Sequence, residues 1–252
     1  MEDAVFADLR RLVLRGATGR VLEVGAGTGN NLQHYAALAA EAAAADGDSA
    51  TAAAAAADTG DCNPNPLPYT RLVMVEPSPH MRRQLQAKVD ALAPSAPSLM
   101  ARVEVADGAF PSLPYPDASF DTVVLFLVLC SVPDVAAAVS EVRRLLAPGG
   151  RVLLVEHLAA GDDKPSTAAW QVRLAGLCKI VGDGCHLRRD AVAALAKGGF
   201  DVGGVDERSW SGKGFGPDLF LARVGVGAAV LRGEGMEIGA GKDAGKMKET
   251  DV

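Results

Sequence analysis

Short hydrophobic runs alternate with helical patterns along most of the chain. The runs are rich in Val and Leu and mostly continuous, which is typical of strands buried on both faces of a sheet. They cover residues 20–24, 71–75, 102–105, 121–127 and 151–156. Stretches with apolar residues at helical spacing separate them. This order predicts an α/β fold with a Rossmann-like, doubly wound and mostly parallel seven-stranded sheet.

Boundary signals mark several elements. Ser78 can cap a helix and Pro79 can occupy its first turn. A second helix has apolar residues at helical spacing from Val135 to Leu146 and ends at a Pro-Gly-Gly segment. Near the C-terminus, a helix around residues 189–197 precedes strands at 200–205 and 219–224. Two late strands joined by a short turn predict an antiparallel hairpin at one edge of the sheet.

Residues 1–225 are expected to form one domain, with two segments outside its core. Residues 36–67 begin with a stretch that is mostly alanine and end in a proline-rich stretch. With few large side chains to bury, they are expected to form a surface insertion made of a frayed helix and a loop. Residues 226–252 are rich in Gly and Lys without periodicity, which favours a disordered tail.

Charge and composition exclude several classes of protein. A net charge of −6 and a pI of about 5.3 give no general attraction to phosphate backbones, so no nucleic-acid partner is expected. No apolar run reaches the roughly 18 residues that span a bilayer, and the N-terminus has no signal-peptide pattern. The 4 cysteines are too sparse for a disulfide framework. We therefore expect a cytoplasmic protein without an integral membrane segment.

The most informative segment is a strand that runs into Gly25, Gly27 and Gly29 and then into a helix. Glycines at a strand end let the backbone approach a ligand closely. Their spacing is not the G-x-G-x-x-G of a dinucleotide site, because Asn30 stands where the third glycine is required. Glu23, just before the first glycine, suits a ligand with an ammonium or sulfonium group better than one with a pyrophosphate. The pattern thus disfavours an NAD-dependent oxidoreductase.

Glu76 adds a second half to this candidate site. It ends the second predicted strand, where an acidic residue can accept both hydroxyls of a ribose. It follows Gly25 by about 50 residues, and removing an insertion of roughly 30 leaves the spacing of about 20 that is typical of nucleoside-binding βαβ units. The two features together predict a nucleoside ligand.

With these motifs, the sequence resembles the class I S-adenosylmethionine-dependent methyltransferases with a type-11 methyltransferase domain. The matching segments, in order, are EVGAGTG (23–29), VEP (75–77), FDTVV (120–124), VRRLLAPGG (142–150) and LVE (154–156). A narrower resemblance is to the methyltransferase-like thiol S-methyltransferases and their bacterial and plant relatives. It rests on LVLCSV (127–132), EH (156–157), WQ (170–171) and GCHLRRD (184–190).

The resemblance implies S-adenosyl-L-methionine as cofactor, with S-adenosyl-L-homocysteine as product. It implies that the methionine end of the cofactor is held by Glu23, Gly25, Ala26, Gly27, Gly29 and Asn30. Glu76 and Pro77 would bind the ribose, and Asp107, Gly108 and Ala109 would lie near the adenine. Leu127 and Val128 would close the far side. Members of the narrower group usually begin with a hydrophobic membrane-anchoring segment, which this sequence lacks. A single helix, at about residues 4–15, is expected before the first strand, so the lid over the cofactor is expected to be incomplete.

The acceptor is expected to be a small molecule, and a thiol is the leading hypothesis because it ionises with little help. A lipid amine, a quinone or a phenol remains an alternative, as does a non-catalytic relative that only binds the cofactor. His157 and His186 are the candidate bases, although each also fits a purely structural role. No His, Cys and Asp grouping has the local spacing of a metal site, so none is predicted.

Overall fold

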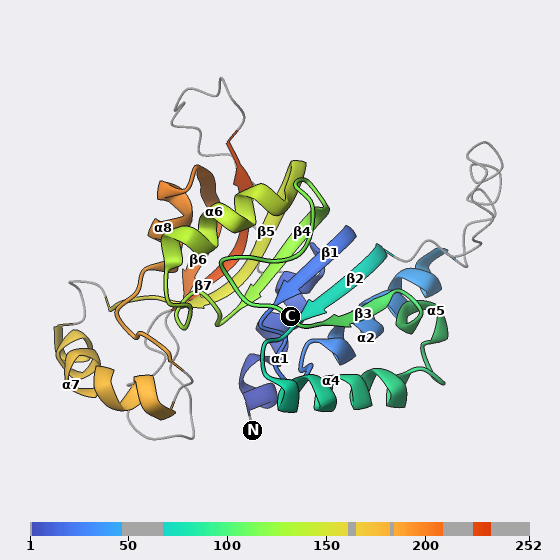
Figure 1. Cartoon of the computed structure of the whole chain (residues 1–252), viewed down its shortest axis with the longest axis horizontal. Coiled ribbons are helices and arrows are strands. Elements are labelled where there is room, and N and C mark those ends of the chain that lie inside the picture. Colours follow the sequence, from blue (N-terminus) through green and yellow to red (C-terminus); the bar gives the residue numbers. More distant parts are fainter. Residues whose placement is uncertain (1, 47–67, 161–164, 182–183, 209–223, 233–252) are drawn as a thin grey trace.

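The computed structural model describes residues 2–46, 68–160, 165–181, 184–208 and 224–232, and its centre is a sheet of 7 strands in the order β3-β2-β1-β4-β5-β7-β6 (Figure 1). The strands are β1 (Gly19–Val24), β2 (Tyr69–Val75), β3 (Val103–Ala106), β4 (Phe120–Phe126), β5 (Leu146–His157), β6 (Phe200–Arg208) and β7 (Val224–Leu231). β1 to β5 pair in parallel, whereas β7 runs antiparallel to both β5 and β6. The predicted mostly parallel, Rossmann-like sheet is confirmed.

Helices cover both faces of the sheet (Figure 1). On one face the core includes side chains of α1 (Glu2–Leu14), α2 (Leu32–Asp46), α4 (Pro79–Leu92) and α5 (Pro97–Met100). On the other it includes side chains of α6 (Val135–Leu145) and α8 (Ala191–Lys197). Successive side chains of a strand point to opposite faces, so continuously apolar strands supply both cores. In β1, for example, Val21 belongs to the first core and Leu22 to the second.

The predicted helix boundaries agree closely with the structure. The Ser78 hydroxyl accepts a hydrogen bond from the Met81 N–H, and Pro79 begins α4. Helix α6 ends at Leu145, before the predicted end at the Pro-Gly-Gly segment, because Leu146 is already extended and begins β5. A further helix, α7 (Pro165–Val181), was not predicted. Within the described ranges, no helix has both the length and the hydropathy that a bilayer crossing requires.

The antiparallel pair of C-terminal strands is confirmed, but the last strand was predicted in the wrong place. Strand β7 covers Val224–Leu231 rather than residues 219–224, of which 219–223 lie outside the described residues. The prediction of disorder from residue 226 onward is therefore wrong as far as Leu231, and the rest of that segment is not described. Strand β7 lies between β5 and β6 in the sheet. The chain therefore forms the edge strand β6 first and then adds β7 between β6 and β5.

The alanine-rich segment begins inside the core rather than on the surface. Helix α2 continues to Asp46, and its Leu38 and Ala39 are buried against the first core. Residues 47–67, the greater part of the expected insertion, lie outside the described residues. The first turns of this segment are thus a packed helix, because alanine allows close approach of the helix to its neighbours.

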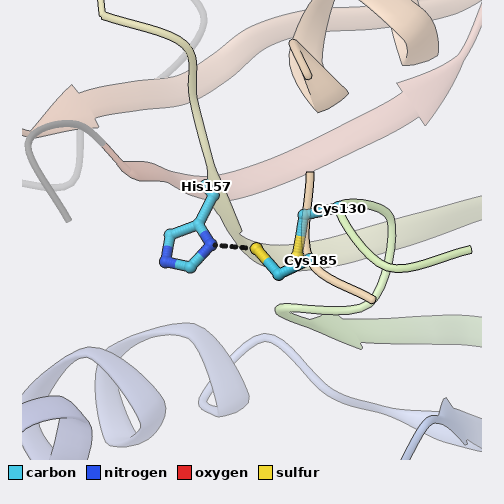
Figure 2. Close-up of side chains that lie close together, drawn as sticks. All are labelled: Cys130, His157 and Cys185. Atoms are coloured by element: carbon cyan, nitrogen blue, oxygen red, sulfur yellow. Dashed lines mark hydrogen bonds between the residues drawn. The ribbon is translucent and has the colours of Figure 1, made fainter. Parts of the chain in front are cut away.

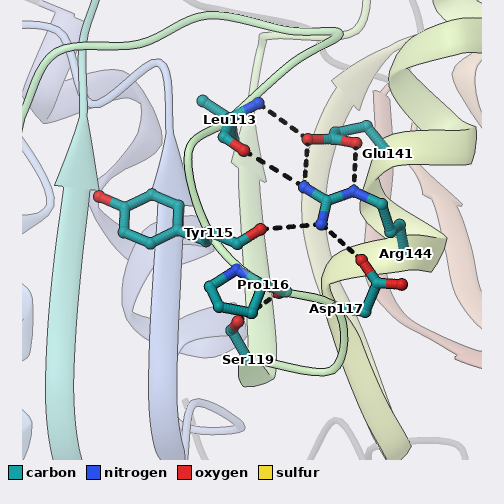
Figure 3. A network of polar contacts seen from close by, with 7 residues as sticks. All are labelled: Leu113, Tyr115, Pro116, Asp117, Ser119, Glu141 and Arg144. Carbon is teal, nitrogen blue, oxygen red and sulfur yellow. Dashed lines mark hydrogen bonds and ion pairs between the residues drawn. The ribbon is translucent and has the colours of Figure 1, made fainter.

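Arg144 on α6 fixes the loop that follows β3 (Figure 3). Its guanidinium donates to both carboxylate oxygens of Glu141, each at 2.8 Å, and to the backbone carbonyls of Tyr115 at 2.8 Å and Leu113 at 3.2 Å. Asp117 accepts a further bond at 2.7 Å, and the Leu113 N–H donates to Glu141. This network holds the loop against the sheet and thereby positions the segment just before it, residues 108–110.

Candidate cofactor site and acceptor pocket

A cavity of about 720 Å³ lies at the carboxyl ends of the parallel strands, where α/β sheets bind their ligands. Every parallel strand from β1 to β5 contributes to its wall, either by its last residue or by the loop after it. The lining residues are Val24, Gly25, Gly27, Glu76, Pro77, Met81, Gly108, Ala109, Phe110, Phe126, Leu127, Val128, Cys130, Ser131, Val132, Pro133, His157, Cys185 and Leu187. The wall is mostly apolar with a few polar groups, as expected for a small-molecule site.

The glycine loop after β1 has a backbone conformation that residues other than glycine rarely adopt. Gly25, Gly27 and Gly29 all have positive φ, of 68°, 57° and 79°. A Cβ on Gly25 would lie 2.8 Å from a Val128 methyl group, whereas a Cβ on Gly27 would meet no described atom within 4 Å. Gly25 thus lets the loops after β1 and β4 touch, and Gly27 leaves room for a ligand to contact the backbone.

Glu76 lies beside this loop, as the sequence predicted. Its side chain is only 5% exposed, and its two oxygens accept hydrogen bonds from the Gly27 N–H at 2.9 Å and the Ser78 N–H at 2.8 Å. A carboxylate can accept about four hydrogen bonds, so these two leave capacity for two ligand hydroxyls. Pro77 next to it also lines the cavity.

Glu23 does not line the cavity. It points to the opposite face of β1 from Val24, accepts a hydrogen bond from the Asn31 amide at 3.0 Å and is fully buried near Tyr35 and Arg10. Burial raises the pKa of this carboxyl to about 7, although hydrogen bonds from Tyr35 and Asn31 act in the other direction. Its hydrogen bond with Asn31 joins the end of β1 to the residue that follows the glycine loop, so Glu23 stabilises the loop from the side away from the cavity.

The other predicted cofactor residues are divided between the cavity wall and its surroundings. Gly108, Ala109, Leu127 and Val128 line the wall. Ala26 and Gly29 of the glycine loop do not line the wall. Ala26 is buried, and a Cβ on Gly29 would lie 2.5 Å from Leu85 of α4. Asn30 accepts a hydrogen bond from Lys88 at 3.0 Å. Asp107 is 72% exposed and pairs with Arg82 at 2.7 Å, away from the wall.

The loop after β4 is held from two sides. Leu127 has a positive φ of 56°, an unusual conformation for a leucine. One oxygen of the buried Glu156 accepts the N–H groups of Val128 at 2.8 Å and Leu129 at 2.9 Å. Arg189 donates to the carbonyls of Leu129, Cys130, Val132 and Pro133. Residues 127–133 therefore form a rigid wall of the cavity.

His157 and Cys185 lie close to Cys130 of this loop (Figure 2). His157 ends β5 and lines the cavity, and its Nδ1 lies 3.4 Å from the Cys185 sulfur. Burial, together with the charges of Arg189 and Lys179, lowers the pKa of His186, but this residue is not part of the cavity wall. Of the two predicted bases, the structure places only His157 at the cavity.

Sequence reasoning missed Cys130 and Cys185, to which it gave no role in a functional site. Both are buried and both line the cavity. Phe110, Phe126 and Met81 of the apolar wall were missed as well. The position of Cys130 shortly after a strand end was an available signal, whereas Cys185 reaches the site only through the path of the chain after α7.

A Rossmann-like sheet with a glycine loop and a strand-end carboxylate at one cavity defines a class of enzymes that bind a nucleoside cofactor. The family model described as a methyltransferase domain matches residues 1–198, and the chain belongs to this family. The resemblance to class I methyltransferases that the motifs indicated is thereby confirmed.

Individual relatives agree with this assignment. Human thiol S-methyltransferase TMT1B is 32% identical over 180 residues, which cover 70% of this chain and 59% of that protein. Human TMT1A is 28% identical over 198 residues, with 78% and 66% covered. The chain thus spans less than two thirds of the length of these relatives.

Solved structures show the same fold. A putative methyltransferase from Bacillus halodurans superposes with a TM-score of 0.54 at 18% identity, covering 82% of this chain and 74% of that one. The methyltransferase CalH, solved in complex with S-adenosylhomocysteine, gives a TM-score of 0.53 at 20% identity, with 88% and 54% covered.

Proposed function

We propose that this protein transfers the methyl group of S-adenosylmethionine to a small-molecule thiol. The observation that carries the cofactor assignment is the position of Glu76, buried at the cavity beside the glycine loop. A carboxylate there can accept ribose hydroxyls, and the open backbone at Gly27 can receive the methionine part. The family match supports the same cofactor.

The remaining part of the cavity has the properties of an acceptor pocket. Apolar side chains of Phe110, Phe126 and Leu187 occur there together with the polar group of His157. Methyl transfer from a sulfonium is an in-line displacement with a neutral leaving group, so the protein mainly has to align donor and acceptor. A thiol fits this site because its pKa near 8.5 makes the thiolate accessible. The two human thiol S-methyltransferases support this choice of acceptor.

Calorimetric titration with S-adenosylhomocysteine tests the cofactor part of the proposal. We expect micromolar binding to the wild type and at least tenfold weaker binding to Glu76→Ala, because each hydrogen bond to a charged group contributes about 1.5–3 kcal/mol. Glu104→Ala is a matched control, since Glu104 is an exposed residue of β3 that pairs with Arg71. No binding by a folded wild-type protein would refute the proposal.

A methylation assay with a panel of acceptors tests the other part. Short alkyl thiols should be methylated faster than phenols, quinones or amines of similar size. A preference for lipid amines would instead agree with another relative, the phosphatidylethanolamine N-methyltransferase of Cereibacter sphaeroides, which is 29% identical over 164 residues. Cofactor binding without turnover on any acceptor would indicate a non-catalytic relative.

A further inference from the structure

Cys130, His157 and Cys185 form a cluster at one wall of the cavity (Figure 2). One ligand atom from each residue lies within 4.8 Å of the other two. The three come from separate segments: the loop after β4, the end of β5 and the segment before α8. Such a cluster cannot be recognised from local spacing, which is why the sequence predicted no metal site.

The dimensions of the cluster are close to those of a tetrahedral metal centre. With zinc bonds of about 2.3 Å to sulfur and 2.0–2.1 Å to nitrogen, the ligand atoms of a tetrahedral site are about 3.5–3.8 Å apart. The His157 Nδ1 and the Cys185 sulfur, at 3.4 Å, already have nearly this separation. The remaining separations, at most 4.8 Å, require movements of about 1 Å, which side-chain rotation can supply.

The backbone that carries the two cysteines is fixed before any ligand binds. The His186 N–H donates to the Cys130 carbonyl at 2.8 Å, and Arg189 donates to the same carbonyl at 3.3 Å. These bonds join the segment of Cys185 directly to the loop of Cys130. Rigid surroundings of this kind hold metal ligands at the correct distance in known sites.

The chemistry of the cluster also indicates a cation. Two thiolates and one imidazole are the ligands that zinc prefers, and as thiolates they would neutralise a divalent charge. All three residues line the cavity, so a fourth coordination position faces the space available to an acceptor.

We infer that Cys130, His157 and Cys185 bind one zinc-like divalent cation whose open position receives the sulfur of the acceptor. The binding site itself is independent of the proposed function, whereas its role in thiol activation rests on it. On coordination, the acceptor thiol releases its proton to solvent. The thiolate then attacks the methyl carbon: the new carbon–sulfur bond forms while the sulfonium bond breaks, and its electron pair stays on S-adenosylhomocysteine. The neutral thioether product is a weak ligand and leaves.

Titration with Co²⁺ tests the site directly. The full chain is stripped of metal with a chelator, kept reduced, and titrated while its absorption spectrum is recorded. We expect one Co²⁺ per chain, with the visible bands of a tetrahedral ion and a near-ultraviolet thiolate-to-cobalt band, and displacement of both by Zn²⁺. A folded wild-type protein without a thiolate-to-cobalt band would overturn the inference.

Variants identify the ligands. Cys185→Ser and Cys130→Ser should lose the thiolate-to-cobalt band, and Cys62→Ser, which leaves the three ligands in place, should keep it. Cys185→Asp replaces one ligand by another, so it should regain Co²⁺ binding with about half the thiolate-to-cobalt intensity. Retention of the full band in both serine variants would contradict the assignment. Circular dichroism checks that each variant is folded.

Activity separates the two proposals. With an alkyl thiol at pH 6.5, the zinc-loaded protein should react at least tenfold faster than the stripped protein, because coordination lowers the pKa of a thiol. Equal rates would overturn the activating role. A cobalt-binding protein that fails to bind S-adenosylhomocysteine would refute the proposed function but not the site, and the reverse result would refute the site alone.

Discussion

Replacing Glu156 by Gln should remove a large pH-dependent cost to folding. Glu156 is fully buried at the end of β5, where one oxygen accepts the Val128 and Leu129 N–H groups and the other has no hydrogen-bond partner among the described residues. Burial, with a smaller contribution from Cys130, raises the pKa of this carboxyl from 4.5 to about 8. The folded protein therefore holds a proton that the unfolded chain loses between these two values.

The sign of the effect follows from linkage. Where the folded state binds more protons than the unfolded state, the free energy of unfolding falls as the pH rises, by about 1.4 kcal/mol per pH unit. For Glu156 the loss begins near pH 4.5 and is complete above about pH 8. It amounts to about 5 kcal/mol over the whole interval. Glutamine is nearly isosteric, keeps an acceptor for the two N–H groups and does not ionise.

Urea unfolding at pH 5, 7 and 9 measures the difference between the two proteins. We expect the free energy of unfolding of Glu156→Gln to be within about 1 kcal/mol of the wild-type value at pH 5. At pH 9 the variant should be several kcal/mol more stable than the wild type. Glu141→Gln is the control, because a hydrogen bond from Arg144 lowers the pKa of Glu141 and its contribution changes only below pH 4.5. A constant difference between wild type and Glu156→Gln across the range would refute the reasoning.

Three further substitutions test the walls of the cavity. Gly25→Ala, at positive φ and facing a Val128 methyl group at 2.8 Å, should lower the free energy of unfolding by about 2–3 kcal/mol in urea titrations. Asp107→Asn removes an exposed ion pair with Arg82, so calorimetry should give an S-adenosylhomocysteine affinity within about twofold of wild type; a tenfold loss would instead support the predicted role of Asp107 near the adenine. Arg189→Met leaves several loop carbonyls without their donor, and hydrogen exchange of residues 127–133 should accelerate at least tenfold.

Most strands could be predicted because buried parallel strands are continuous apolar runs, a pattern that needs no tertiary information. The last strand was misplaced for a physical reason. Gly225 and Gly227 interrupt the apolar run of the β7 sequence, and glycine inside such a run argues against a strand. In the structure a Cβ on Gly227 would lie 2.1 Å from the Gly204 carbonyl oxygen, so close approach of two backbones requires glycine there.

The candidate site was predictable where it depends on strand ends and not where it depends on side-chain direction. Glu76, Gly25 and Gly27 follow their strands directly, and they meet at the cavity. Glu23 lies inside β1, where the alternation of side chains turns it away from the cavity to Asn31. The meeting of Cys130 with Cys185 depends on hydrogen bonds between distant segments, which the sequence does not display.

The placement of β7 has a consequence for the order in which the chain can fold during synthesis. In sequence β7 follows all the other strands of the described residues, yet in space it lies between β5 and β6 and pairs with both. While residues 224–231 are still inside the ribosome, one edge of β5 has no partner, and an open edge of this kind favours pairing between chains. We therefore expect the nascent chain to be most prone to aggregation, and most dependent on chaperones, just before β7 emerges.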